Sequence, residues 1–371
     1  MSILQFSQNM IRLRHMRKLT QEQLADFIGV TKASISKWET GQSLPDILML
    51  PRLAAFFDVT IDELLGYEPQ LSQEQIRRMY QELAGAFAER PFEEAMEQSK
   101  EQVKRYYSCY PFLFHVCNLW LNHFWLAGES ARQMEILKEI KDLCGHILSG
   151  CRDIGICEDT VLLKAAVELQ MGKTAEVMEA LEELLNPCRL SKQSDMLLTQ
   201  AYLQAGQKEK GEQFAQMSMF LHLMNLVAGA TQYLALHGQD STVCEKTISR
   251  VEQVIAAYHL ELLHPNAAAM FFYQAAVCCC MQGREQEALE LLGRYVAAVA
   301  YLLKEDDLSL HGDDYFDQLG GWYEQLDIGT QAPRDTRLIR EDFRKSLDAP
   351  VFAVLQERAE YQRLREVCQR T

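Results

Sequence analysis

The residues best suited to a chemical task lie between Thr20 and Gly41, in the stretch TQEQLADFIGVTKASISKWETG. The spacing of Ile35 and Trp38 predicts a short helix with one apolar face. Its opposite face is basic or hydroxylic, carrying Lys32, Ser34, Ser36 and Lys37. Ammonium and hydroxyl groups donate hydrogen bonds to phosphate oxygens and to base edges. This helix therefore suits insertion into the major groove of DNA.

Two predicted helices joined by a tight turn must position this polar face. Thr20 provides a hydroxyl N-cap for the first helix, and Gln23 completes a capping box. The apolar stripe of that helix consists of Leu24, Ala25 and Ile28. Gly29 then stands where a left-handed or closely packed backbone requires glycine. Thr31 caps the second helix, and the small residues Ala25 and Gly29 allow the two helices to cross closely.

The order of TQEQLA, Gly29 and SISKWETG closely resembles the Cro and phage-repressor type of helix-turn-helix, the XRE family. The resemblance implies a five-helix DNA-binding domain over residues 1–66. By the positions of that family, the residues that face the bases are Lys32, Ala33, Ser36 and Lys37. Those that contact phosphates are Gln21, Ser34 and Thr40. It also implies a partly buried ion pair between Arg14 and Glu39. An ordinary helical hairpin is the alternative.

The remaining helices of this head, residues 1–66, follow from local signals. The first helix is expected from about Leu4 to Arg17. The fourth is expected to start near Leu48, with Pro51 in its first turn, where no N–H partner is lost. Thr60 caps a fifth helix that ends at Gly66. Residues 67–72 are interpreted as a linker.

Charge separates the head from the rest of this 371-residue chain. The formal net charge is -15, yet the head holds seven Lys or Arg and seven Asp or Glu, so the remainder carries the whole excess. Phosphate should repel such an acidic body. We therefore expect the body to perform a task other than DNA binding.

The 11 cysteines are expected to be reduced thiols, because there is no signal peptide and a chain of this length can bury a core without disulfides. The best metal candidates lack finger-like spacing, so no metal or cofactor is predicted; they are Cys109, His115, Cys117 and His123. A redox switch could be formed by three further cysteines, but no feature of the sequence supports it; they are Cys144, Cys151 and Cys157. Residues 278–280 are consecutive cysteines and point in different directions on a helix.

Two uncharged stretches approach the length of a membrane span, Tyr106 to Gly128 and Met217 to Leu236. Both contain polar groups, and Pro111 and Gly229 are expected to interrupt them. We interpret both as buried helices of a soluble, cytoplasmic protein without a membrane segment.

After residue 72 every pattern predicts helix, so the fold class is all-α. Helices joined by a glycine-containing turn recur at Gly128, Gly172, Gly206, Gly238 and Gly283. Their steps are 44, 34, 32 and 45 residues, and the middle two match the ~34-residue period of tetratricopeptide repeats. Residues 73–304 are thus expected to form a tetratricopeptide-like array, and an irregular bundle is the alternative. Residues 305–371 should cap it, with helices at 315–326, 337–347 and 351–368.

The combination resembles bacterial regulators in which a phage-repressor-type head precedes tetratricopeptide repeats, some of which bind peptides (the RRNPP group). It implies a DNA-binding transcriptional regulator whose repeat domain dimerises and senses a peptide or small-molecule effector. In the peptide-sensing members asparagines hold the peptide, and Asn118, Asn122, Asn225 and Asn266 are the candidates here. The acidic body favours a cationic effector.

A homodimer on a palindromic operator is expected, because one recognition helix spans few base pairs. The alternative is a regulator whose repeats form a protein-protein interaction scaffold. An enzyme is not expected, since no nucleophile elbow, phosphate loop or HExxH motif occurs, and the His-Gly-Asp-Asp sequence at 311–314 has no partner motif.

Overall fold

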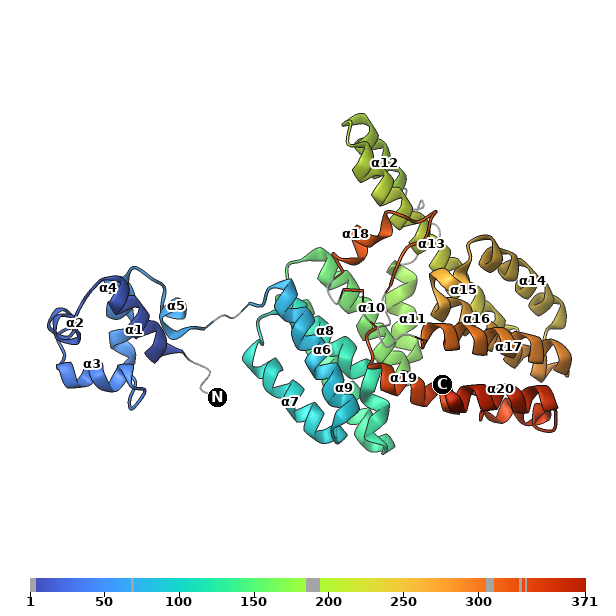
Figure 1. Cartoon of the computed structure of the whole chain (residues 1–371), viewed down its shortest axis with the longest axis horizontal. Coiled ribbons are helices and arrows are strands. Elements are labelled where there is room, and N and C mark those ends of the chain that lie inside the picture. The colour runs from blue at the N-terminus through green and yellow to red at the C-terminus, as the bar shows by residue number, and fades with distance from the viewer. Residues whose placement is uncertain (1–4, 68–69, 185–193, 305–309, 327–328, 331) are drawn as a thin grey trace. The chain divides into compact units, whose positions relative to one another are not determined.

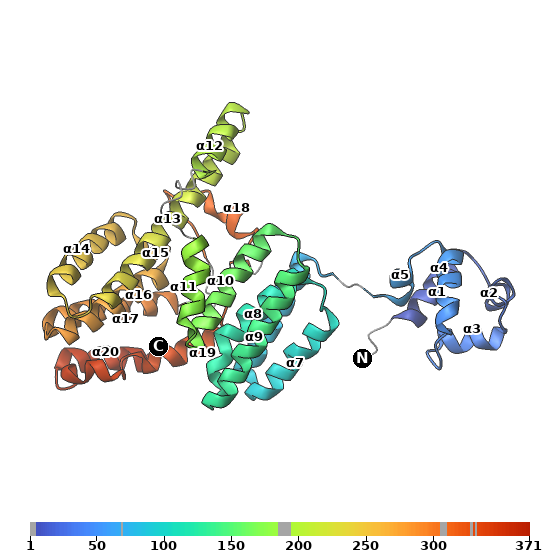
Figure 2. The same ribbon diagram turned by 180° about the vertical axis from the view of Figure 1, so that it is seen from behind.

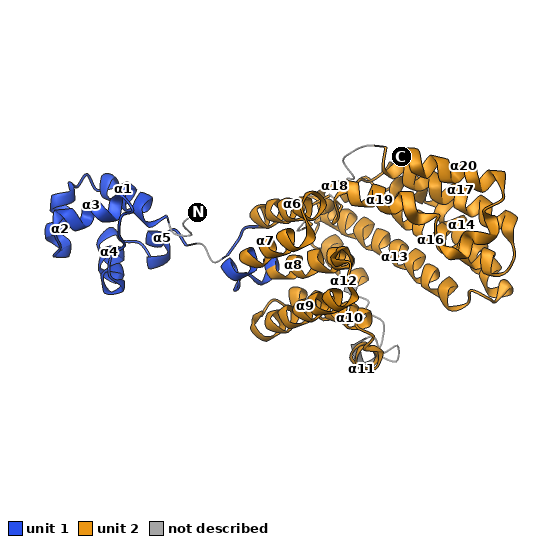
Figure 3. Cartoon of the chain, turned by 90° about the horizontal axis from the view of Figure 1, so that it is seen from below, with its two compact units in different colours: residues 1–72, 102–112 blue, residues 73–101, 113–371 orange. Residues whose placement is uncertain are grey.

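The computed structural model describes residues 5–67, 70–184, 194–304, 310–326, 329–330 and 332–371 (Figure 1). Every regular element in these ranges is a helix, which confirms the all-α fold class. The chain divides into two compact units, residues 1–72 with 102–112 and residues 73–101 with 113–371 (Figure 3). Residues 68–69 of the predicted linker lie outside the described ranges. The predicted domain boundaries themselves stay a prediction.

The head is built from five short α-helices and one 3-10 turn. These are α1 (Phe6–Met16), α2 (Gln21–Ile28), α3 (Lys32–Glu39), η1 (Ile47–Met49), α4 (Leu50–Phe57) and α5 (Ile61–Leu65). Fully buried side chains from all five α-helices meet in one apolar core, namely Phe6, Met10, Leu24, Ile35, Leu53 and Leu64. The amphipathic faces predicted from the sequence are thus buried against each other.

The caps that define the head helices are as predicted. The Thr20 hydroxyl accepts the Gln23 N–H at 3.2 Å, and the Gln23 side chain accepts the Thr20 N–H at 2.9 Å. Thr60 caps α5 by the same reciprocal arrangement, and Gly66 ends that helix in the left-handed region. Pro51 lies in the first turn of α4, although the preceding turn at Ile47–Met49 is a separate 3-10 segment.

Seventeen further helical elements follow the head in the part of the chain that the structure describes. They are α6 (Gln73–Glu89), α7 (Phe92–Arg105), α8 (Tyr110–His123), η2 (Phe124–Ala127), α9 (Ser130–Gly150), α10 (Ile154–Gln170), α11 (Thr174–Leu184), α12 (Ser194–Gln204), α13 (Lys208–Leu236), α14 (Ser241–Ala257), α15 (Leu260–Leu263), α16 (Pro265–Met281), α17 (Glu285–Leu302), α18 (Leu319–Tyr323) and α19 (Thr336–Ser346). The chain then closes with η3 (Pro350–Leu355) and α20 (Ala359–Arg370). The buried core of the second unit is centred on α13, α16 and α17.

All five predicted glycine turns join two helices. Gly128, Gly172, Gly206 and Gly283 have positive φ angles between 71° and 76°, whereas Gly238 does not. Gly211 allows α12 and α13 to approach closely, because a Cβ there would lie 3.3 Å from the Tyr202 Cβ. The interval from Gly206 to Gly238 holds the single long helix α13, not a helix pair. A regular repeat is therefore absent at that position.

The expectation that both uncharged stretches are buried is correct for only one of them. In α8 the side chains of Leu113, Val116 and Leu119 are buried, and Pro111 stands in the first turn, where it does not interrupt the helix. In contrast, α13 continues through Gly229 without a break, since one glycine costs a helix only about 1 kcal/mol. Of the most apolar 18 residues of α13, 22% are buried. Among the described residues α13 alone is long and apolar enough to cross a membrane.

Two predicted helices near the C-terminus are wrong in extent. The helix expected over 315–326 is reduced to α18, because Asp313 accepts the N–H groups of Tyr315 and Phe316 and holds them in a turn. The helix expected over 351–368 is divided into η3 and α20. Arg358 takes an extended backbone between them, and its guanidinium contacts Glu285 of α17. Residues 305–309, with which the predicted cap begins, lie outside the described ranges.

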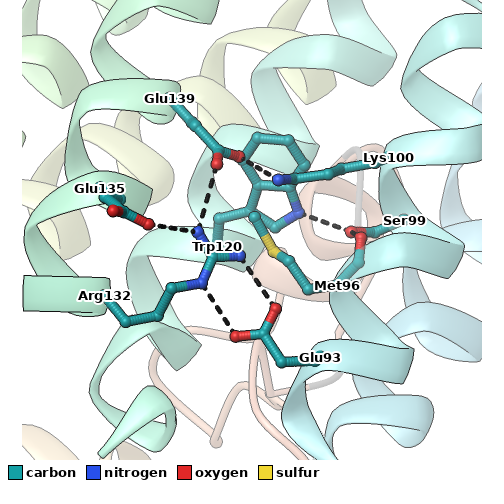
Figure 4. Close-up of polar contacts among 8 residues, drawn as sticks. All are labelled: Glu93, Met96, Ser99, Lys100, Trp120, Arg132, Glu135 and Glu139. Carbon is teal, nitrogen blue, oxygen red and sulfur yellow. Dashed lines mark hydrogen bonds and ion pairs between the residues drawn. The ribbon is translucent and has the colours of Figure 1, made fainter. Parts of the chain in front are cut away.

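A polar network joins α7 to α9 across the buried Trp120 of α8 (Figure 4). Arg132 donates to both carboxylate oxygens of Glu93 at 2.9 Å, and Lys100 contacts Glu139 at 2.6 Å. The Trp120 indole N–H donates to Ser99 at 2.8 Å. Because every member in the network is paired, it fixes how these three helices pack.

Candidate nucleic-acid interface

The structure presents α3 as a helix with one buried and one open face. Thr31 caps it by accepting the Ser34 N–H at 3.1 Å, and Gly29 reverses the chain before it with φ of 80°. Ile35 is fully buried and Trp38 nearly so. On the other side Lys32, Ala33 and Lys37 are exposed, while Ser34 and Ser36 are half-buried. The four predicted base-facing residues are thereby brought to one helix.

A buried ion pair anchors the end of α3 to α1. The Arg14 Nε and Nη2 atoms donate to the two Glu39 carboxylate oxygens at 2.6 and 2.9 Å. Gln21 of α2 donates to the same carboxylate at 2.8 Å. Burial alone would raise the pKa of Glu39, but the hydrogen bonds from Arg14 and Gln21 outweigh it and lower that pKa. Three helices are therefore fixed around one carboxylate.

Several predicted contact residues already have intramolecular partners. The Gln21 amide is held by Glu39, and the Thr40 hydroxyl donates to the carbonyl of Ser36 at 2.9 Å. The Ser34 hydroxyl lies 2.9 Å from that of Thr31. The Lys32 ammonium is 3.7 Å from Glu22, and both side chains are more than half exposed. A phosphate must compete with these partners. The competition is weakest at the Lys32–Glu22 pair, because water already screens this exposed pair.

Sequence reasoning missed the turn that follows α3. The backbone N–H groups of Gln42 and Ser43 both point to the Lys37 carbonyl, at 2.9 and 3.3 Å, and their side chains are exposed. Gly41 permits this with φ of 73°. The glycine after Thr40 was the available signal, because a left-handed residue there folds the next polar side chains alongside the helix end.

These features coincide with the comparison against known proteins. The helix-turn-helix family profile matches residues 10–64, which include α2, α3 and the Arg14–Glu39 pair. The head is a helix-turn-helix domain. The resemblance to the XRE family is thus confirmed for the head. The exposed face of α3 belongs to this helix-turn-helix domain.

Curated relatives share this domain. The transcriptional activator BcrR of Enterococcus faecalis is 45% identical over 65 residues, covering 18% of this chain and 32% of BcrR. The phage CTXphi repressor RstR of Vibrio cholerae is 41% identical over 58 residues, 15% of this chain and 52% of RstR. The regulator AnsR of Bacillus subtilis is 40% identical over 65 residues, 17% of this chain and 56% of AnsR. The chain thus spans about a third of the first and about half of the others. No solved structure matches the chain significantly.

The four candidate effector asparagines lie on three helices, and their role stays a prediction. Asn118 and Asn122 lie one turn apart on α8, and their amides donate to the carbonyls of Phe114 and Asn118 at 3.4 and 2.9 Å. Asn225 and Asn266 are exposed on α13 and α16. Among the described residues no group of three or more His, Cys, Asp or Glu is placed to hold a metal.

Proposed function

We propose that the chain is a cytoplasmic, DNA-binding transcriptional regulator that reads its operator through α3. The observation that supports this most concerns the two faces of α3. Ile35 is buried and holds the helix against the core of the head, while Lys32 and Lys37 are exposed on the opposite face. Lysine donates to guanine O6 and N7 or to phosphates, and Ala33 is small enough to contact a thymine methyl group. Ser36 completes the base-facing set. Gln21, Ser34 and Thr40 would contact phosphates after exchanging their present partners.

The test compares DNA binding of Lys37→Ala with that of Lys345→Ala in the full chain. Lys345 lies on α19 and is 68% exposed, so both variants remove one exposed positive charge. We expect Lys37→Ala to weaken binding to a selected duplex by about 1–3 kcal/mol and Lys345→Ala to leave it unchanged. Equal effects of the two variants would refute base or phosphate contact by α3.

We also propose a homodimer, because two heads are needed to read a palindrome with useful specificity. The surface that supports it is α12 with the adjoining part of α13, which Figures 1 and 2 show standing away from the other helices of the second unit. On α12, Met196, Leu197 and Leu203 are 60%, 64% and 58% exposed. A helix apolar on several sides requires more cover than one neighbouring helix gives.

Charge favours a second copy as that cover. Residues 196–207, which include most of α12, and residues 213–239 of α13 and the turn after it contain no Lys, Arg, Asp or Glu, while the whole chain carries -15. Two such chains repel each other over most of their surface and least over this one. Sedimentation velocity at micromolar concentration tests it: Leu197→Glu should give monomers, and Val354→Glu, at a 55% exposed position on η3, should leave the dimer intact. A monomeric native protein, or dimers of Leu197→Glu, would refute this interface.

For the tetratricopeptide-like body we propose an effector-sensing role, with a cationic peptide or small molecule as ligand. The acidic excess outside the head supports it. Native mass spectrometry of protein purified from its host, followed by denaturation, would release such a ligand. A co-purifying protein in place of a small ligand would instead support the interaction scaffold.

A further inference from the structure

Two cysteines of the second unit differ from the other eight that the structure describes. Cys151 and Cys157 are partly exposed, whereas the others are buried: Cys109, Cys117, Cys144, Cys244, Cys278, Cys279, Cys280 and Cys368. Oxidation of cysteine follows exposure and thiolate character. Among the described cysteines, these two accessible thiols are therefore the ones that an oxidant reaches first.

The turn between α9 and α10 brings these two thiols together. Cys151 ends α9, with its N–H on the Ile147 carbonyl at 2.8 Å, and Cys157 is the fourth residue of α10. Asp153 caps α10 between them. The Cys157 Sγ lies 3.6 Å from the Cys151 carbonyl oxygen, and the Cys151 Sγ lies 4.0 Å from the Asp153 carbonyl oxygen. The Cys151 side chain also lies close enough to Cys157 to raise the pKa of the Cys157 thiol.

We propose that Cys151 and Cys157 form a reversible oxidation site that a hydroperoxide converts to a disulfide. The Cys151 sulfur attacks the peroxide, so that an S–O bond forms, the O–O bond breaks and an alcohol or water leaves with the thiol proton. The Cys157 sulfur then attacks the Cys151 sulfenic acid, which forms the S–S bond and releases water with the Cys157 proton. The two thiols lose two electrons and the peroxide gains them.

The surroundings assign the two roles. The Cys157 thiol donates toward the Cys151 carbonyl, and partial burial with the neighbouring thiol and the Asp153 carboxylate raises the pKa of Cys157. It therefore stays protonated until the second step. The Cys151 thiol makes the longer contact, 4.0 Å to the Asp153 carbonyl oxygen, so we assign it the first attack. The site shares no residue with α3 or with the proposed dimer surface.

The chain offers a matched control in Cys117 and Cys144. Their thiols also interact with each other, but both side chains are fully buried. If proximity alone decided oxidation, this pair would react as readily as Cys151 and Cys157. If access decides it, only the exposed pair reacts.

The experiment treats the full chain with limiting hydrogen peroxide, blocks the remaining thiols and digests without reduction. Because trypsin cleaves after Arg152, the disulfide would join peptide Asp142–Arg152 to Asp153–Lys164, and fragment spectra identify the sulfur used. The buried pair would join Tyr106–Arg132 to Asp142–Arg152 instead. We expect the first link to form at least about tenfold faster than the second, and a thiol reductant to reverse it.

Two variants test the order of the steps. Cys157→Ser should accumulate a sulfenic acid on Cys151 that a dione reagent traps, and Cys151→Ser should give neither the link nor a trapped Cys157. Equal rates for the two linked pairs, no 151–157 link, or a sulfenic acid trapped on Cys157 in Cys151→Ser would each overturn the proposal.

Discussion

Removing Arg14 should be the most damaging single change in the head. The Arg14 and Glu39 side chains are 10% and 5% exposed, so water cannot replace the lost partner. In Arg14→Ala the buried carboxylate keeps only the Gln21 hydrogen bond at 2.8 Å. Breaking one half of a buried ion pair costs about 3–5 kcal/mol. A domain of this size has only about 3–5 kcal/mol in total, so the variant head should be largely unfolded.

Hydrogen exchange of the full chain measures this cost where it arises. The amides of α1, α2 and α3 should exchange about 10²- to 10⁴-fold faster in Arg14→Ala, at about 1.4 kcal/mol per factor of ten, up to the limit set by full unfolding. Lys32→Ala provides the control, because its pair with Glu22 is exposed on both sides. An exposed pair contributes at most about 1 kcal/mol, so exchange should change by less than about fivefold.

The double variant Arg14→Met with Glu39→Leu should recover most of the stability that Arg14→Ala loses. Apolar side chains of similar volume remove the buried charge together with its partner, so stability should return to within about 1–2 kcal/mol of the native head. Two results would refute the account. One is a change below tenfold in Arg14→Ala, and the other is a double variant less stable than the single one.

Three further outcomes follow from the structure of the head. The hydrogen bonds of Arg14 and Gln21 lower the pKa of Glu39. The stability that this carboxylate gives the head is therefore complete above the ordinary glutamate pKa of about 4.3 and is lost as pH falls below it. Hydrogen exchange of α1–α3 between pH 6 and 3 would show this loss, and a head stabilised by acid would contradict it. Gly29→Ala should destabilise the head by about 1–2 kcal/mol, because the backbone φ there is 80°. Gly85→Ala inside α6 should instead stabilise its helix by about 0.5–1 kcal/mol. Denaturant titrations measure both, and a change of the same sign in the two variants would contradict the role given to φ at Gly29. If Lys37 contacts phosphate, Lys37→Ala should reduce the slope of log K against log salt by about 1, and an unchanged slope with weaker binding would point to base contact alone.

The sequence predicts the head well because its signals are local. Thr20, Gly29 and Thr60 each fix a helix end through their own hydroxyl or backbone, so no distant partner is needed. The base-facing set depends only on helical spacing from Ile35. That Gln21 turns inward to Glu39 could not be predicted, since this partner depends on how three helices pack.

The body was predicted less completely because its helices are defined by tertiary contacts. Glycine turns marked helix boundaries correctly, yet the periodic steps did not reveal that α13 runs unbroken from Lys208 to Leu236. Nor could composition distinguish the buried α8 from the largely exposed stretch 217–236 of α13, as both are uncharged and apolar. The extended Arg358 that divides η3 from α20 depends on Glu285, which is far away in sequence.

Selection of random duplexes by the full chain tests the central claim most directly. If α3 reads DNA from a dimer, selection at physiological salt should enrich a two-fold sequence whose half-sites lie about 10 base pairs apart, or a multiple of that spacing. Lys32→Ala with Lys37→Ala should abolish that enrichment while the protein stays folded. Binding without any enriched sequence, or enrichment unaffected by the double variant, would contradict the account.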